Sequence, residues 1–367
     1  MSKLRKTFKY RLYPNRAQVV LLERQLVLCC EVYNAALQER RDAWRMGRNR
    51  ISFPMQSAQL PLIKGDCSEL REVYSQVLQD VLHRVDKAFD GFFRRAKRGE
   101  TPGFPRFRSR RRYDSLTYPQ LGFSLEGNYL ALTKVGVLKV KLHRPLEGTV
   151  KTLTLKRECG KWYALFSCEV ETAPLLPSDK AVGIDLGLES FLTTSDGEHV
   201  ENPRHLRQAE FRLVKAQQRV SQRKKGGNRR RKAVRLLARQ YQKVRNCRKD
   251  FHHKTARELV QSYGFIAAED LRIRNMVQNG HLSKSISDAG WGQFVSILQA
   301  KAEWAGREVV LVNPRNTSQV CSRCGAHVSK PLSERVHSCP ICGLFLHRDV
   351  NAARNILALG RSVQVKS

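Results

Sequence analysis

The sequence predicts a multidomain α/β fold, in which an N-terminal antiparallel β-barrel or curled sheet carries an inserted helical layer and precedes a second α/β domain with a zinc ribbon. Short runs of alternating apolar and polar residues occur at 3–13 and between about 115 and 170, as in half-buried strands. Helical spacing of apolar residues occupies much of 17–97. Beyond 180, short apolar strands and long helical runs precede four cysteines at metal-ligand spacing.

The N-terminal half begins with a strand, KLRKTFKYRLY, which Pro14 and Asn15 terminate. Apolar residues then recur at helical spacing over about 17–46 and 68–97. The polar face of this helical layer carries a set of basic residues: Arg40, Arg41, Arg45, Arg48, Arg50, Arg84, Arg94, Arg95, Lys97 and Arg98. Alternating strands to about residue 170 and a proline-rich linker at 171–180 complete this half.

The segment 101–114, TPGFPRFRSRRRYD, is expected to be an irregular loop because proline and glycine interrupt it. Phe104 and Phe107 alternate with basic residues that can meet phosphates, namely Arg106, Arg108, Arg110, Arg111 and Arg112. The alternative is a solvated basic loop that two core phenylalanines hold in place.

The second half opens with an apolar strand that ends at Asp185 and forms a hairpin with the next strand. Two long helices follow over about 203–261, joined at Gly226 and Gly227. The turn between them is strongly basic, with Arg223, Lys224, Lys225, Arg229, Arg230 and Arg231, and is predicted to lie along a nucleic-acid backbone. A further apolar strand, FIAAEDL, then delivers Glu269 and Asp270 at its carboxyl end.

Four cysteines, Cys321, Cys324, Cys339 and Cys342, stand as two C-x2-C pairs separated by fourteen residues. Four thiolates in two short knuckles suit one tetrahedral Zn2+ in a closed structural site. The remaining six cysteines show no framework spacing, so free thiols in a reducing compartment are expected. A helix carrying Asp349 near its start follows the ribbon.

The charge of the chain favours a polyanionic partner. Lys and Arg number 67 against 33 Asp and Glu, a formal net charge of +34 over 367 residues. The charge is spread along the chain and interleaved with apolar residues, which favours nucleic acid over a membrane surface. The N-terminus has no apolar signal region, and no stretch reaches the roughly 18 apolar residues of a membrane span. A soluble intracellular protein is therefore expected.

Asp185, Glu269 and Asp349 each bring an acid to the edge of an apolar segment. Such a set is what phosphodiester hydrolysis with two Mg2+ ions requires, with Mn2+ as an alternative ion. Each acid alone could equally be a cap or a paired core residue.

The chain resembles the TnpB family, the RNA-guided DNA endonucleases of insertion sequences. The matching stretches are YRLYPNRAQ, GFPRFRSR, VGIDLGL, SQRKKGG, AEDLRIRNM, SISDAGWGQF, NTSQVCSRCG, CPICG and HRDVNAARN. The resemblance implies an RNase H-like (RuvC) domain at 181–316 that resumes at 346–367, with Asp185, Glu269 and Asp349 as catalytic acids. It makes 317–345 a zinc-bearing target-strand loading insert, 1–14 and 105–180 the wedge barrel, and 15–104 the recognition layer.

The resemblance further implies partners: a guide RNA from the transposon end and target double-stranded DNA, bound by a monomer in the cytoplasm of a prokaryote, at the nucleoid. A short motif beside the target would be read near Phe53, Gln56 and Gln79.

Two rival hypotheses remain. A strand-transfer DNA transposase would use the same three acids without RNA. A non-enzymatic binding module would explain the charge and the ribbon but leave the acids without a role.

Overall fold

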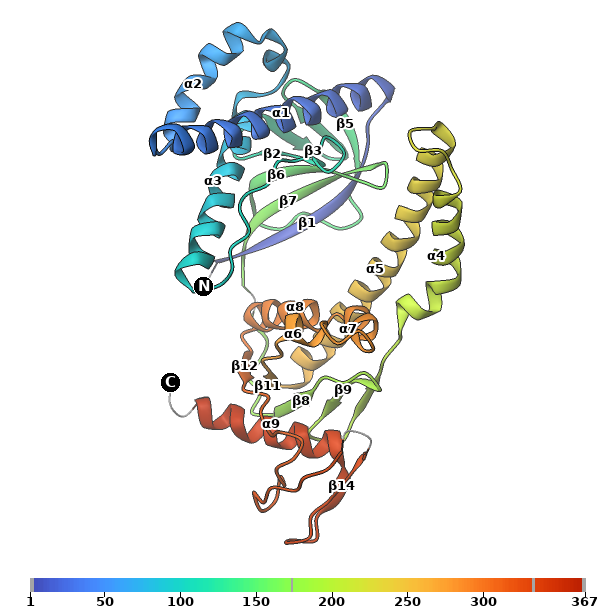
Figure 1. Ribbon diagram of the computed structural model, residues 1–367. Coiled ribbons are helices and arrows are strands. Elements are labelled where there is room, and N and C mark those ends of the chain that lie inside the picture. The colour runs from blue at the N-terminus through green and yellow to red at the C-terminus, as the bar shows by residue number, and fades with distance from the viewer. Residues whose placement is uncertain (1–2, 173, 332–333, 365–367) are drawn as a thin grey trace. The chain divides into compact units, whose positions relative to one another are not determined.

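The computed structural model describes residues 3–172, 174–331 and 334–364. The chain divides into two compact units, residues 1–171 and 172–367 (Figure 1).

The first unit is built on a seven-stranded antiparallel sheet. Its strands are β1 (Lys3–Tyr13), β2 (Ser115–Tyr118), β3 (Phe123–Glu126), β4 (Tyr129–Leu132), β5 (Gly136–Lys141), β6 (Thr149–Glu158) and β7 (Lys161–Glu171), in the order β2-β6-β7-β1-β5-β4-β3. The first strand thus lies between β7 and β5. It therefore joins the sheet in its middle, although its neighbours follow about a hundred residues later in the chain. The predicted curled antiparallel sheet is confirmed.

Alternation along these strands places one face in the core. Phe8, Tyr10 and Leu12 of β1 are fully buried, while the residues between them are partly or largely exposed. Trp162, Ala164, Phe166 and Cys168 repeat the pattern on β7. Successive side chains of a strand point to opposite faces of the sheet. One face of these strands is therefore buried and the other is exposed, as the sequence predicts.

Three α-helices pack with this sheet into one core: α1 (Arg16–Gly47), α2 (Phe53–Asp66) and α3 (Ser75–Lys97). Asn15 caps α1, because its side chain accepts from the Gln18 backbone N–H and the Gln18 side chain accepts from the Asn15 backbone N–H. The sequence reading missed α2, whose apolar residues show no helical periodicity and which contains Pro61. A short 3-10 turn at Ser68–Glu72 leads into α3.

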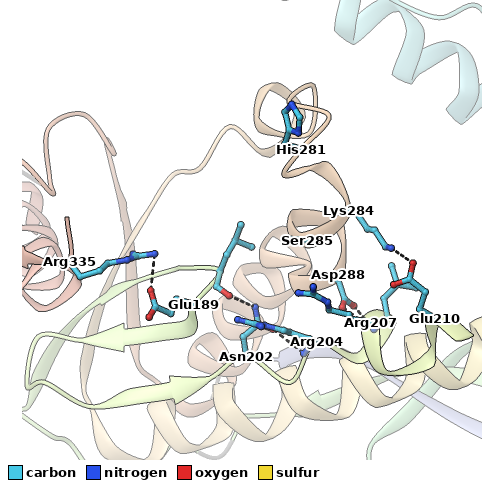
Figure 2. A pocket seen from close by; sticks show the side chains of 12 residues that line it. Glu189, Asn202, Arg204, Arg207, Glu210, His281, Lys284, Ser285, Asp288 and Arg335 are labelled. Atoms are coloured by element: carbon cyan, nitrogen blue, oxygen red, sulfur yellow. Dashed lines mark hydrogen bonds and ion pairs between the residues drawn. The ribbon is translucent and has the colours of Figure 1, made fainter. Parts of the chain in front are cut away.

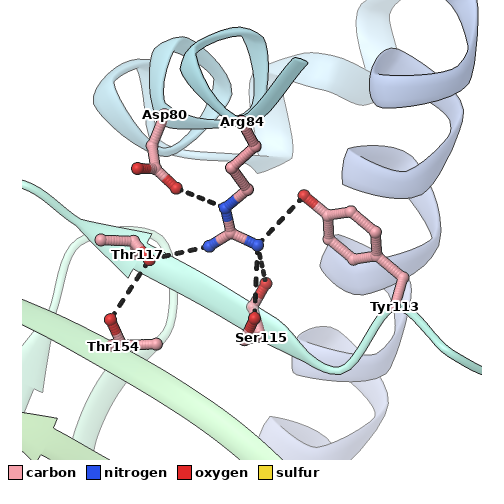
Figure 3. Close-up of polar contacts among 6 residues, drawn as sticks. All are labelled: Asp80, Arg84, Tyr113, Ser115, Thr117 and Thr154. Atoms are coloured by element: carbon pink, nitrogen blue, oxygen red, sulfur yellow. Dashed lines mark hydrogen bonds and ion pairs between the residues drawn. The ribbon is translucent and has the colours of Figure 1, made fainter. Parts of the chain in front are cut away.

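Arg84 joins α3 to the sheet (Figure 3). Its Nε donates to Asp80 on the same helix at 2.7 Å, and its terminal nitrogens donate to Thr117 at 2.7 Å and to the Ser115 carbonyl at 3.0 Å on β2. Arg40 is buried, whereas Arg84 is partly buried, and Arg40 donates to Gln56 and Asp86 at 2.8 Å each. Both arginines, predicted on the polar face of the helical layer, are therefore internal ties between elements.

The second unit contains a five-stranded mixed sheet. Its strands are β8 (Ala181–Asp185), β9 (Ser190–Thr194), β10 (His199–Glu201), β11 (Phe265–Glu269) and β12 (Glu308–Val312), in the order β10-β9-β8-β11-β12. The strands β8, β11 and β12 run parallel, whereas β9 and β10 are antiparallel to their neighbours. The α/β character predicted for this half of the chain is confirmed.

The helices of this unit are α4 (His205–Ser221), α5 (Asn228–Ser262), α6 (Ile273–Met276), α7 (Ser283–Ala289), α8 (Trp291–Ala305) and α9 (Arg348–Gln364), of which α4 packs against α5 rather than on the sheet. Ile266 and Ala268 of β11 belong to the core with α5 and α8. Phe265 and Ala267, which point to the other face, pack with Ile356 of α9. The glycines at 226 and 227 separate α4 from α5, as predicted.

Small residues bring α9 close to the sheet. A Cβ added to Gly183 of β8 would lie 2.0 Å from the Ala353 carbonyl oxygen, and one added to Gly360 would lie 2.6 Å from the Ala267 Cβ. Neither distance is compatible with a larger residue, so glycine sets the approach of α9 to β8 and β11. This approach determines where Asp349, at the start of α9, stands relative to the strand ends.

The cysteine-rich segment contains one small hairpin in its described part, β13 (Val336–Ser338) paired with β14 (Phe345–His347). No helix in the described ranges combines the length and apolar character needed to cross a membrane.

Candidate functional site

Three acids meet at one edge of the second unit's sheet. Asp185 is the last residue of β8 and Glu269 is the last residue of β11. These strands are parallel neighbours in which Ile184 pairs with Ala268, so the two acids occupy adjacent strand ends. Asp349 lies in the first turn of α9, which packs on the same two strands. The structure therefore brings together three residues that are up to 164 positions apart in the sequence.

The carboxylates form a cluster of like charges in which Glu269 is buried and Asp185 and Asp349 are partly buried. Burial raises the pKa of Asp185 well above its ordinary value, and the negative charges of Glu269 and Asp349 raise it further. Burial also raises the pKa of Glu269, which is 8% exposed. Such a cluster is costly without compensation, and hard oxygen donors are what a divalent cation such as Mg2+ prefers. The donor set thus fits the predicted magnesium site.

Thr317 orients Glu269, a contact that the sequence reading missed. The Thr317 hydroxyl donates to Glu269 Oε1 at 2.6 Å, and both side chains are buried. This threonine lies in NTSQVC, directly before the first cysteine pair. A hydroxyl that fixes one carboxylate oxygen leaves the other free to bind a ligand.

Thr317→Val is expected to weaken divalent-metal binding about 10- to 100-fold, because the near-isosteric side chain removes the hydroxyl that orients Glu269. Titration of Mn2+ into magnesium-free protein, followed by electron paramagnetic resonance, measures this directly. Thr317→Ser keeps the hydroxyl and serves as the matched control. Equal Mn2+ affinity in the valine variant and the wild type would contradict the positioning role.

Two arginines flank the acids. Arg348 is buried, donates to the Pro331 carbonyl at 2.9 Å and to Ser318 at 3.2 Å, and counteracts the rise in the pKa of Asp185. Arg335 is about half exposed, lies 3.9 Å from Asp349 Oδ2 and pairs with Glu189 at 2.8 Å. Arg348 could have been noticed as the neighbour of Asp349, whereas nothing in the sequence pairs Arg335 with the acids.

The four cysteines converge as predicted. Their Sγ atoms all lie within 4.8 Å of one another, with Cys321 to Cys342 and Cys324 to Cys339 at 3.6 Å. A tetrahedral Zn2+ with bonds of about 2.3 Å needs sulfur pairs about 3.8 Å apart, so the thiolates fit this ion. Hydrogen bonds from the backbone at Cys342 and Ile341 lower the pKa of Cys339 to about 6, which favours the thiolate.

Two asparagines one helical turn apart connect the ribbon to α9. Asn351, which is fully buried, accepts from the Ser322 backbone N–H at 2.9 Å and donates to the Val320 carbonyl at 2.7 Å. Asn355 donates to the carbonyls of Thr317 and Val320 at 2.8 and 2.7 Å. The first cysteine pair is thereby bonded to the helix that carries Asp349.

The basic segments singled out in the sequence lie on the surface. All five arginines of the 106–112 loop are exposed, although Arg110 pairs with Glu31 at 2.5 Å. Phe104 packs edge-on against Phe89 and Phe92 while it remains 46% exposed. Its ring therefore anchors the loop and is still partly accessible. The basic turn between α4 and α5 is exposed at Arg223, Lys224, Lys225, Arg229 and Arg231, and Arg230 is half-buried.

The three residues expected near a base-reading site differ in their accessibility. Gln79 is exposed on α3, and Phe53 stacks on His83 with ring centroids 3.7 Å apart. Gln56 is 2% exposed; its carbonyl oxygen accepts from Arg40 and its amide donates to the Ala36 carbonyl and to Glu39. In this conformation the Gln56 amide makes its hydrogen bonds inside the protein. Gln79 is therefore the accessible candidate.

Three protein families match separate parts of the chain. The family described as "Probable transposase" matches residues 165–280, that described as "Cas12f1-like, TNB domain" matches 291–356, and that described as "Helix-turn-helix domain" matches 1–49. Within the last range, the described residues form the strand β1 and the single long helix α1.

Two relatives align with nearly the whole chain. A protein of Streptomyces pristinaespiralis named as an RNA-guided DNA endonuclease is 39% identical over 369 residues, which cover 98% of this chain and 90% of the relative. The RNA-guided DNA endonuclease InsQ of Escherichia coli is 31% identical over 377 residues, covering 97% and 92%. The protein of the "Cryo-EM structure of the Cas12f1-sgRNA-target DNA complex" shares the fold, with a TM-score of 0.61 at 15% identity over 96% of this chain and 98% of that one.

Proposed function

The chain belongs to the TnpB family of RNA-guided DNA endonucleases, and on that basis we propose that it binds a guide RNA from its transposon end, recognises a short target-adjacent DNA motif and hydrolyses DNA phosphodiesters at Asp185, Glu269 and Asp349. The observation that carries the proposal is the meeting of these three acids at one sheet edge, where burial and then the charges of Glu269 and Asp349 raise the pKa of Asp185. Sequence selection would be left to pairing between guide and target.

Divalent ions bound by the three carboxylates would supply an activated water and stabilise the leaving 3' oxygen. The chain itself contributes orientation. Thr317 holds one oxygen of Glu269, and the bonds of Asn351 and Asn355 hold the start of α9 beside the strand ends. Arg335, between Glu189 and Asp349, offers a positive charge to the phosphate that approaches the acids.

The first unit supplies the surfaces for RNA and for the DNA motif in this proposal. Its loop 106–112 presents five exposed arginines that can contact phosphates. Gln79 on α3 is the accessible side chain of the three expected near the motif. An amide can bond a base edge in the major groove, so Gln79 is the first residue to test for motif preference.

The decisive experiment is to purify the protein and sequence any RNA that accompanies it. A discrete RNA that ends in transposon sequence is expected, and the complex should cut a plasmid bearing the matching target when Mg2+ is added. A guide replaced by an unrelated sequence should redirect cutting to the new target. Cutting that ignores the guide would contradict RNA guidance.

One observation favours a second candidate, since the family matching residues 165–280 is described as a transposase. A strand-transfer enzyme with the same acids would join DNA ends and need no RNA. Assaying the RNA-free protein for joining of terminal-repeat DNA separates the two functions.

A further inference from the structure

A cavity of about 640 Å³ lies in the second unit beside the acid cluster. The loop after β8, the turn before α4, the first turns of α4 and the helix α7 form its walls (Figure 2). Glu189 in its wall follows Asp185 by four residues, and Arg335 in its wall contacts both Glu189 and Asp349. The cavity is thus connected to the acid cluster through Arg335.

Each acid that lines the cavity already has a cationic partner. Arg335 pairs with Glu189, Lys284 pairs with Glu210, and Arg248 pairs with Asp288 at 2.9 Å. Asp288 also accepts the backbone N–H of Leu206. Because each of these acids is already paired, little negative charge remains to balance further cationic side chains that line the cavity.

Two further arginines line the same cavity without an ion pair among the described residues: Arg204 and Arg207, both exposed. Arg204 has φ 47° and ψ 47°, a left-handed conformation that costs free energy in a non-glycine residue. Asn202 supports it by accepting the Arg204 backbone N–H at 3.2 Å and donating to the Leu188 carbonyl at 3.0 Å. The turn at Arg204 and the first turn of α4 at Arg207 thus place two guanidinium groups at the cavity, and neither has a carboxylate partner among the described residues.

We propose that Arg204 and Arg207 bind the phosphates of the single DNA strand that is being delivered to Asp185, Glu269 and Asp349. The cavity is of the size that holds a small ligand or a short stretch of one strand, and it has no room for a duplex. Guanidinium groups match phosphate oxygens in bidentate geometry. DNA is favoured over guide RNA because the cavity connects with the cutting site through Arg335. This inference rests on the proposed function and adds the residues that hold its substrate.

The test compares the double variant Arg204→Gln/Arg207→Gln with Arg212→Gln/Arg219→Gln, which removes the same charge from exposed positions of α4 outside the cavity. Both are prepared as complexes with guide RNA. The cavity variant is expected to retain its RNA and its binding of target duplex, while single-turnover cleavage falls about 10- to 100-fold relative to the control, since a misplaced strand loses catalytic orientation.

A second readout does not require cleavage. Fluorescence anisotropy of a labelled single-stranded oligothymidylate on the magnesium-free complex, across a salt series, should show a slope lower by about 1.4 in the cavity variant, as expected for two lost phosphate contacts. Equal slopes and rates in the two double variants would overturn the inference, and loss of guide RNA from the cavity variant alone would overturn it in favour of RNA as the occupant. A wild type that binds the oligonucleotide through these arginines but does not cut would refute the proposed function and leave this site standing.

Discussion

Asp185→Ala is expected to reduce cleavage at least about a thousandfold, or about 4 kcal/mol in activation free energy, while RNA-dependent DNA binding stays within a few-fold of the wild type. The charges of both Glu269 and Asp349 act on Asp185, and its removal leaves two acids that cannot hold two cations. The basic surfaces proposed to bind nucleic acid carry none of these acids. Single-turnover cleavage and a gel-shift assay with programmed complex measure the two effects.

Asp250→Ala is the matched control, because Asp250 is an exposed acid that pairs with Lys254 one turn away on α5. It should cut like the wild type. Retained cleavage in Asp185→Ala would refute the site, and equal loss of binding and cleavage would point to a folding defect.

The same carboxylate gives a pH signature without magnesium. Burial and the neighbouring acids raise the pKa of Asp185 in the folded state above its ordinary value of 3.8, so the folded protein binds the proton more tightly than the unfolded chain. Stability therefore falls as pH rises from about 4 through the raised pKa. Asp185→Asn should unfold at a higher temperature than the wild type at neutral pH in magnesium-free buffer, with a smaller difference near pH 4.

Cys339→Ser is expected to lower the zinc content and to reduce cleavage about a hundredfold, with much less effect on guide-RNA content. The physical reason is the chain of bonds from the first cysteine pair through Asn351 and Asn355 to α9, since a shift of about 1 Å at Asp349 is enough for a loss of this size. Elemental analysis of the purified complex, RNA quantification and single-turnover cleavage test the three parts.

Cys247→Ser controls for loss of a thiol, because Cys247 is exposed on α5 and belongs to no metal cluster in the described residues. It should keep full zinc content and activity. Parallel loss of RNA and cleavage in Cys339→Ser would mean that the ribbon supports the fold alone.

Much of the fold could be predicted from local pattern. The strands ending at Asp185 and Glu269, the break at Gly226 and the alternation of β1 follow from periodicity and turn chemistry. The helix α2 could not, because its apolar residues do not follow one face. Charge was the other weak signal: Arg40 and Arg84 look like surface cations in sequence, yet each is held by an internal network.

By itself the sequence singled out the four cysteines, the three acids and the basic segments. Cysteine spacing predicts a ribbon with little information from the rest of the chain, because each C-x2-C knuckle is formed by residues that are close in sequence. The tertiary structure decided how the acids are held and approached. The contact of Thr317 with Glu269 joins positions 48 residues apart, and the cavity that Arg204 and Arg207 line is formed together with residues of α7 and with Arg335. Such contacts depend on strand order and on the close approach of α9 at Gly183, which no local pattern encodes.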